Sequence, residues 1–304
     1  MNIKSYLFIF AIILIAYTGY GQAKTDTTYI EKYDKKMSVM AFLSRSSIEI
    51  DQNDKSFQPN SPMKIGLGLA IKNTVLNISY GAAITQTSNK DHGKTKALDF
   101  QLHQYGRYFV LDLFYQKYKG FYNDDNGVSL YPNTTVQITG AEGTYIFKGN
   151  KLSAKAAFQQ SEKQLKSVGS FVLGGGIYNF RIKEVNDLFP WENNNINNLQ
   201  LGASAGYAYS WVINEHWLLS GIATVGANFG NETHLLEKGN VKIYPAVFTR
   251  GSFGYHKNDW AVNFSFLINN KSLYVDEEDS FNISSLNMQI SFVQHLDNFF
   301  KAKK

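Results

Sequence analysis

The sequence predicts an all-β protein, a transmembrane, antiparallel, up-and-down β-barrel of the bacterial outer membrane. Large apolar residues alternate with small or polar ones along many segments, most of them about 10 to 13 residues long. Ordinary strands average about 5 or 6 residues, whereas a tilted strand that crosses a membrane needs about 9 to 11. Tight turns also alternate with long polar loops, as outer-membrane barrels require. A soluble β-sandwich shares only the alternation, so length and turn pattern favour the barrel.

Segment 62–71 illustrates the two faces that the alternation predicts. Ile65 and Leu67 fall on one face, and Lys64 and Gly66 fall on the other. Because successive side chains of a strand point to opposite sides, the first face is expected to contact lipid and the second to line the lumen. The same pattern recurs in residues 74–84, 259–271 and 282–297.

The number of strands follows from the turns. Tight turns lie at residues 72–73, 106–107 and 149–150, and again at 214–215 and 257–258. The first three follow even-numbered strand candidates and the last two follow odd-numbered ones, so the alternation of tight turns and long loops shifts by one candidate between Lys151 and Gln200. Single-chain bacterial barrels have an even number of strands, so the thirteen candidates cannot all be correct. We predict about twelve strands, or fourteen if residues 184–198 contain an additional strand. The candidates are 36–48, 62–71, 74–84, 95–106, 108–119, 135–148, 151–161, 168–183, 199–211, 216–230, 241–256, 259–271 and 282–297.

The N-terminus has the layout of a cleavable secretory signal. Lys4 precedes an apolar stretch from Leu7 to Tyr17, and small residues follow at 18–21. The apolar stretch is shorter than the roughly 20 residues of a membrane-spanning helix, so we expect cleavage between Gly21 and Gln22. The predicted organisation is a signal peptide (1–21), a short periplasmic leader (22–34), the barrel (35–297) and a basic tail (298–304).

Composition and motifs give no support to an enzyme, a metal site or a nucleic-acid partner. The chain has no cysteine, and its net charge of +5 comes from scattered basic residues. Gly202–Gly206 matches the G-x-S-x-G pattern of hydrolases, but it continues into an alternating strand and not into a helix. We therefore predict no catalytic, cofactor-binding or metal-binding residue. The histidines lack metal-ligand spacing; they are His92, His103, His216, His234, His256 and His295.

Polar side chains alternate along two strands that a tight turn at Gly106 joins into a hairpin. Facing side chains of such strands lie within reach of each other, and barrel lumens are polar. These residues are expected to form a hydrogen-bonded ladder in the lumen, although a constriction with a ligand role and an acid–base group remain alternatives. The candidate residues are Asp99, Gln101, His103, Tyr105, Asp112 and Gln116.

Four blocks of the chain resemble a Bacteroidota family known as domain of unknown function 4421. They are Asp26–Lys36 (DTTYIEKYDKK), Phe42–Arg45 (FLSR), Leu98–Tyr122 and Val168–Asn179 (VGSFVLGGGIYN). The resemblance spans most of the mature chain. It implies an outer-membrane barrel without an assigned activity, and it carries no functional residue to this sequence.

The sequence favours a non-enzymatic outer-membrane barrel that acts as a small pore or as an envelope structural protein. Its expected partners are outer-membrane lipid, the barrel-assembly machinery during insertion and small solutes. The first alternative is a lipid-modifying acyl hydrolase, which would need a histidine and a serine that face lipid. The second is a receptor or scaffold whose partner docks on the long loops. The direction of His103, toward the lumen or toward lipid, separates the leading hypothesis from the hydrolase.

Overall fold

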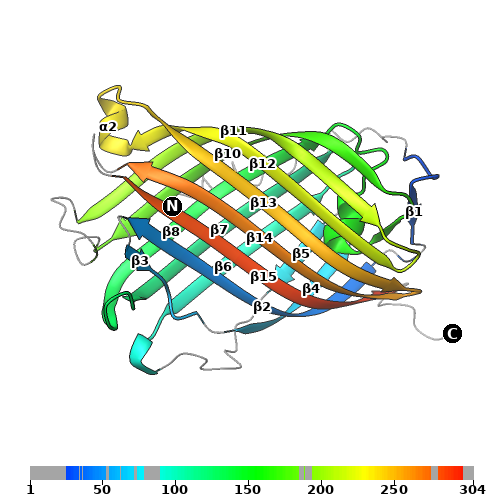
Figure 1. The fold of residues 1–304 in the computed structure, drawn as a ribbon, viewed down its shortest axis with the longest axis horizontal. Coiled ribbons are helices and arrows are strands. Elements are labelled where there is room, and N and C mark those ends of the chain that lie inside the picture. Colours follow the sequence, from blue (N-terminus) through cyan, green and yellow to red (C-terminus); the bar gives the residue numbers. More distant parts are fainter. Residues whose placement is uncertain are drawn as a thin grey trace.

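The computed structural model describes most of the chain after residue 24, and one antiparallel sheet dominates it (Figure 1). Among the residues that the structure describes, the sheet has thirteen strands; twelve form the wall, and the short β3 (Lys55–Phe57) pairs with one end of β2. The described residues are 25–33, 35, 37–52, 55–61, 63–71, 74–78, 90–184, 188, 194–274 and 280–296.

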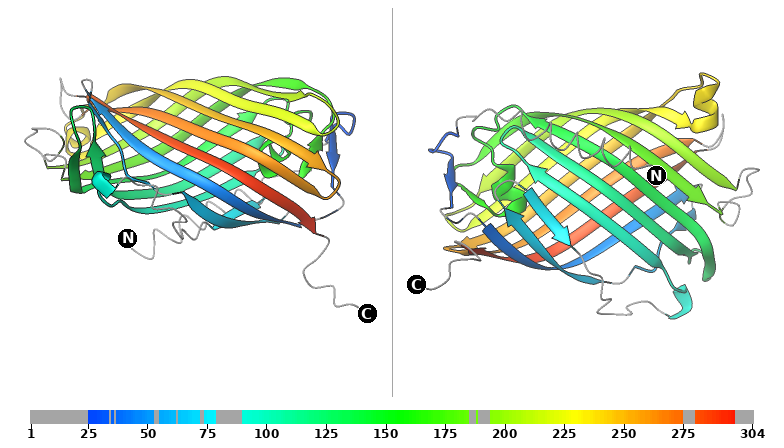
Figure 2. Two further views of the ribbon diagram at one scale, coloured as in Figure 1. Left: turned by 60° about the horizontal axis from the view of Figure 1, so that its bottom comes forward. Right: turned by 180° about the vertical axis from the view of Figure 1, so that it is seen from behind.

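Each wall strand pairs with its neighbours along the chain, and β15 pairs with β2, which closes the sheet into a barrel (Figure 2). The predicted all-β, antiparallel barrel of about twelve strands is therefore confirmed. The wall strands are β2 (Met37–Gln52), β4 (Lys64–Ile71), β5 (Thr74–Ile78), β6 (Lys96–Tyr105), β7 (Phe109–Asn123), β8 (Ser129–Ile146), β10 (Val168–Lys183), β11 (Asn195–Val212), β12 (Trp217–Glu232), β13 (Lys242–Lys257), β14 (Trp260–Tyr274) and β15 (Ser280–Leu296).

The predicted strand at 151–161 is wrong, and it lies in the stretch where the turn pattern located the error. It contains a helical turn, η2 (Lys155–Gln159), that precedes the short strand β9 (Glu162–Gln164). β8 pairs directly with β10, so residues 147–167 form a connection that we call the closing segment. Its alanines favour a helix, and the turn at 149–150 begins this connection instead of joining two wall strands.

The two ends of the barrel differ. The short-turn end carries the connections at 106–108, 213–216 and 258–259, the start of β2, the end of β15 and the closing segment. The long-loop end carries α2 (Thr233–Glu237), β3 and η1 (Lys90–His92), and Figure 1 shows α2 and β3 opposite β1. At this end β7 and β8 extend beyond the rest of the wall as a hairpin.

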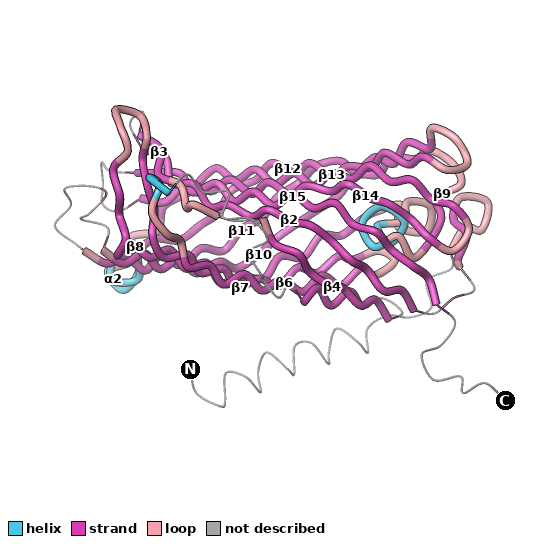
Figure 3. Tube along the Cα trace, turned by 90° about the horizontal axis from the view of Figure 1, so that it is seen from below, coloured by secondary structure: helices cyan, strands magenta, loops and turns pink. Residues whose placement is uncertain are grey.

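The closing segment fills the short-turn end from inside. Leu152 is buried against Tyr105 and Val110 of the wall. β1 (Ile30–Lys32), which follows the predicted cleavage site by a few residues, pairs antiparallel with β9. Figure 3 shows η2 within the outline of the strands beside β9. A second apolar cluster, which includes Ile50, Tyr118, Phe180 and Leu273, occupies the interior toward the long-loop end.

Large apolar side chains cover the outer wall. Leu67, Val225 and Ile290 are exposed there. Aromatic rings gather on the outer wall toward the short-turn end, where Trp217 stacks on Phe253 with ring centroids 4.7 Å apart. Further pairs at this end are Trp260–Phe292, Phe171–Tyr207 and Tyr145–Phe147.

Among the described residues, no helix is both long and apolar enough to cross a membrane.

Candidate functional site

The structure places all six predicted lumen residues on the inner face of the β6–β7 hairpin. His103 lies opposite Asp112, and Asp99 lies opposite Gln116. The intervening Leu98 is exposed on the outer wall. Strand alternation thus turns the polar side chains inward.

Asp112 is the centre of a buried charged group. Its Oδ1 lies 2.5 Å from His103 Nδ1 and accepts a hydrogen bond of 2.9 Å from Arg250 Nη2. Arg250 belongs to β13, which is distant from the hairpin in the sequence, and it is only 4% exposed. Its Nη1 donates to the Tyr105 hydroxyl at 3.4 Å, so one cation joins both strands of the hairpin to β13.

The Arg250 guanidinium also packs against aromatic rings. It lies 5.4 Å from the ring of Phe158 and 5.5 Å from the ring of Phe248. Phe158 belongs to η2, so the closing segment contacts the charged group directly. Low dielectric surroundings strengthen such contacts, and they also make an unpaired charge costly.

Asp99 organises the other end of the ladder. Its Oδ1 accepts a hydrogen bond from Gln101 Nε2 at 3.0 Å. Its Oδ2 accepts from Gln116 Nε2 and from the Tyr118 hydroxyl, each at 3.3 Å. Five of the six predicted residues thus form direct hydrogen bonds to another of the six: Asp99 with Gln101 and Gln116, and His103 with Asp112.

The interior contains further polar groups that the sequence reasoning missed. Glu142 lies opposite Asp112 in the register of β7 and β8 and accepts a hydrogen bond of 2.9 Å from the Tyr178 hydroxyl. Lys271 Nζ lies 3.7 Å from the centre of the Tyr178 ring. A second ladder crosses β11 and β12, where Asn228 Nδ2 donates to Gln200 Oε1 at 2.9 Å. The sequence offered one signal for Glu142, Arg250 and Lys271. Each is an isolated charged residue within a strand, on the face that lines the lumen.

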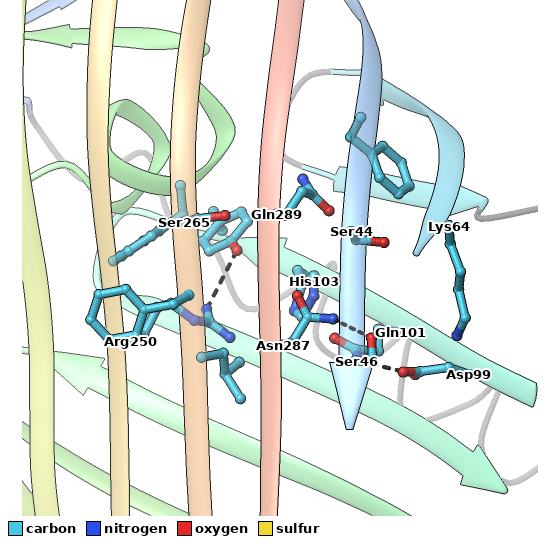
Figure 4. Close-up of a pocket in the computed structure, with 15 residues that line it drawn as sticks. Ser44, Ser46, Lys64, Asp99, Gln101, His103, Arg250, Ser265, Asn287 and Gln289 are labelled. Atoms are coloured by element: carbon cyan, nitrogen blue, oxygen red, sulfur yellow. Dashed lines mark hydrogen bonds between the residues drawn. The ribbon is translucent and has the colours of Figure 1, made fainter. Parts of the chain in front are cut away.

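Between the hairpin and the opposite wall lies a polar chamber of about 80 Å³ (Figure 4). Its lining comes from β2, β4, β6, β13, β14 and β15, and the Phe158 ring of the closing segment contributes to it. Of its polar lining groups, Asp99, Gln101, His103, Asn287 and Gln289 are half-buried. A volume of this size accommodates several water molecules, since one water needs about 10–15 Å³ of such space.

The arrangement bears on the chemistry that the site can perform. His103 points into the barrel and shares Asp112 Oδ1 with Arg250, so it is not the lipid-facing histidine that an acyl hydrolase needs. Ser204 of the G-x-S-x-G pattern lies within β11, not in a strand-to-helix turn. Within the described part of the chain, no three histidine or carboxylate side chains are grouped to hold a metal ion.

The closed sheet, the apolar outer wall and the polar interior define a β-barrel of the membrane-spanning type. The chain belongs to the family described as Domain of unknown function (DUF4421), whose model matches residues 24–293. No curated protein matches its sequence.

Several solved barrels resemble the fold at low identity. The outer-membrane protease OmpT of Escherichia coli is 8% identical, with a TM-score of 0.33 over 85% of this chain and 96% of that one. The β domain of the Bordetella autotransporter BrkA is 11% identical, with a TM-score of 0.36 over 86% and 99%. The toluene transporter TodX of Pseudomonas putida is 6% identical, with a TM-score of 0.29 over 86% and 91%. Similarity at this level carries no argument about function.

Proposed function

We propose that the protein is a non-enzymatic barrel of the Gram-negative outer membrane with a closed lumen, and that it serves as an envelope structural protein instead of an open pore. The observation that carries this proposal is the closing segment, which packs inside the short-turn end. A barrel of about this size can pass small solutes or be filled by its own side chains.

The outer wall supports the membrane location. Exposed side chains such as Leu67, Phe171 and Ile243 would form an unusually large apolar surface on a soluble protein. Aromatic rings that gather at one end of the outer wall are typical of the level of the lipid head groups. Because bacterial barrels have their short turns in the periplasm, we place the short-turn end there. Lipid and, during insertion, the barrel-assembly machinery are then the expected partners.

Buried polar contacts hold the closing segment in place. Glu162 forms ion pairs with Arg107, in the turn between β6 and β7, and with Lys155, the latter at 3.9 Å. Its Oε2 also accepts a hydrogen bond of 2.5 Å from Ser153 Oγ. Burial lowers the pKa of the Lys155 ammonium to about 8, against the opposing influence of Glu162. Buried charges persist when they are paired in this way, so the contacts favour a stably closed end.

Gln164 ties the same segment to the N-terminal residues. Its Nε2 donates to the backbone oxygens of Tyr29 and Lys151, at 3.1 and 2.7 Å. Its Oε1 accepts from the backbone of Ser153 at 2.9 Å. The residues before the first wall strand therefore cover the closing segment from the periplasmic side.

Conductance in a planar lipid bilayer tests the proposal. The full mature protein is expected to show no steady ionic conductance. A variant in which Asn-Gly replaces residues 150–168 would join β8 to β10 by a two-residue hairpin turn, in the register that pairs Ile146 with Val172. This variant is expected to conduct, because the turn removes η2 and β9. Steady conductance of the unaltered protein at the level of the variant would contradict the closed lumen.

The direction of His103 supports the non-enzymatic part of the proposal. Phospholipid vesicles that contain the protein are expected to release no more free fatty acid than vesicles without it. Protein-dependent release that His103→Ala abolishes would contradict this expectation.

A further inference from the structure

Among the described residues, Lys64 is a buried cation without a partner in the polar network. Its side chain extends from the start of β4 into the chamber (Figure 4), and the residue is 8% exposed. Within the described part of the chain, no hydrogen bond or ion pair involves its ammonium group. Arg250, by contrast, has Asp112 at 2.9 Å. Desolvating an ammonium group is costly unless water or another polar group replaces its hydration.

Asp99 lies in the same chamber and balances Lys64 in charge without direct contact. Figure 4 shows the Lys64 ammonium directed toward Asp99, yet none of the ion pairs among the described residues joins them. The hydrogen bonds from Gln101, Gln116 and Tyr118 occupy three acceptor positions of the carboxylate. A carboxylate has about four such positions, so Asp99 can accept one more donor from the chamber.

We propose that the chamber binds a small zwitterion, a molecule with one carboxylate and one ammonium group, such as a small α-amino acid. The ligand carboxylate pairs with Lys64, and its ammonium group donates to Asp99. Such a ligand leaves the net charge of the chamber unchanged, whereas a simple anion would be repelled by Asp99 and a simple cation by Lys64. The inference rests on the proposed closed barrel, because the salt solution of an open pore would screen both charges.

The size and lining of the chamber agree with this ligand class. About 80 Å³ corresponds to roughly five to eight water-sized positions at about 10–15 Å³ each, which suits a ligand with a similar number of non-hydrogen atoms. Gln289 contributes an amide group whose Nε2 contacts only the Met40 sulfur at 3.7 Å among the described residues. A hydroxyl or carboxylate oxygen of the ligand would give that amide a stronger partner.

Equilibrium dialysis of radiolabelled alanine against the full mature protein in detergent micelles tests the proposal. Saturable binding of one alanine per chain is expected, with acetate and methylammonium competing at least about ten-fold less well because each satisfies one charge. Lys64→Met and Asp99→Asn should each weaken binding at least about ten-fold. Lys96→Met, at an exposed position that begins β6, is the matched control and should bind as the unaltered protein does.

Folding of each variant is checked by the heat-dependent electrophoretic mobility of the barrel, and Lys64→Arg, which keeps the charge, should retain binding. Absence of saturable alanine binding would overturn the proposal. Equal binding of acetate that depends on Lys64 alone would also overturn it, in favour of a simple anion site. Neither result depends on conductance, so the closed lumen and the ligand are tested separately.

Discussion

Replacing Asp112 by alanine removes the carboxylate that joins three elements inside the barrel. The side chain accepts a hydrogen bond of 2.9 Å from Arg250 and lies 2.5 Å from His103. Arg250 would keep its burial but lose its ion-pair partner, and removal of one member of a buried pair typically costs about 3–5 kcal/mol. Glu142 also acts electrostatically on Arg250 and would offset part of this loss. We therefore expect Asp112→Ala to lower the free energy of unfolding by about 3 kcal/mol.

The loss can be measured by urea unfolding in lipid vesicles, with tryptophan fluorescence as the signal and linear extrapolation to zero denaturant. The double variant Asp112→Leu/Arg250→Met should recover most of the stability, because paired apolar replacements of a buried ion pair are often neutral or better. Asp259→Ala is the control. It breaks an ion pair with Lys35 in which the two side chains are 51% and 25% exposed, so it should cost about 0–1 kcal/mol.

A cost below about 1 kcal/mol for Asp112→Ala, together with changed ion selectivity of a conducting barrel, would refute this reasoning. It would mean that water hydrates Arg250 in place of the carboxylate. The lumen would then be open around the group, and the charged residues would act on passing ions instead of bracing the wall.

Three further predictions concern the wall and the location of the protein. Phe264→Arg places a charge on the lipid-facing side and should cost about 2–4 kcal/mol if the site lies near mid-membrane; Gln289→Arg, which faces the chamber, should cost less in the same unfolding assay. Gly206→Ala should cost about 1–3 kcal/mol, since a Cβ there would lie 1.9 Å from the backbone oxygen of Ala223; an unchanged unfolding midpoint would contradict that close approach. The mature protein should begin at or near Gln22 and fractionate with the outer membrane, as N-terminal sequencing and cell fractionation will show, and recovery from the soluble periplasm would rule out the membrane location.

The wall could be predicted because strand geometry is local. Side chains at alternate positions face opposite sides, so Ile65 and Leu67 were expected outside and Lys64 inside, as the structure shows. The pairing of His103 with Asp112 was also within reach, because a tight turn fixes the register of the hairpin.

Arg250 and Lys64 illustrate what local patterns could not supply. Arg250 is 138 residues away from Asp112 along the chain, and only closure of the whole sheet brings them together. The pairing of Lys64 with Ser44 across β2 and β4 likewise says nothing about which groups lie across the lumen. The tilt and stagger of all the strands determine which inner-face residues meet across the lumen. The alternation within one strand carries no information about that tilt or stagger.

The closing segment determines how well an inward-facing position tolerates a larger or charged side chain. Strand alternation alone predicts that Asn263 tolerates arginine better than Val262, because a polar lumen accepts charge. The faces are as expected, with Val262 40% exposed and Asn263 only 2% exposed. Yet a Cβ on the neighbouring Gly254 would lie 3.2 Å from both Asn263 Oδ1 and Gln160 Oε1 of the closing segment, so this part of the lumen is packed. Asn263→Arg would overfill it and could cost as much as a lipid-facing charge. An inner face is permissive where the closing segment leaves space, as it does in the chamber beside Lys64 and Asp99.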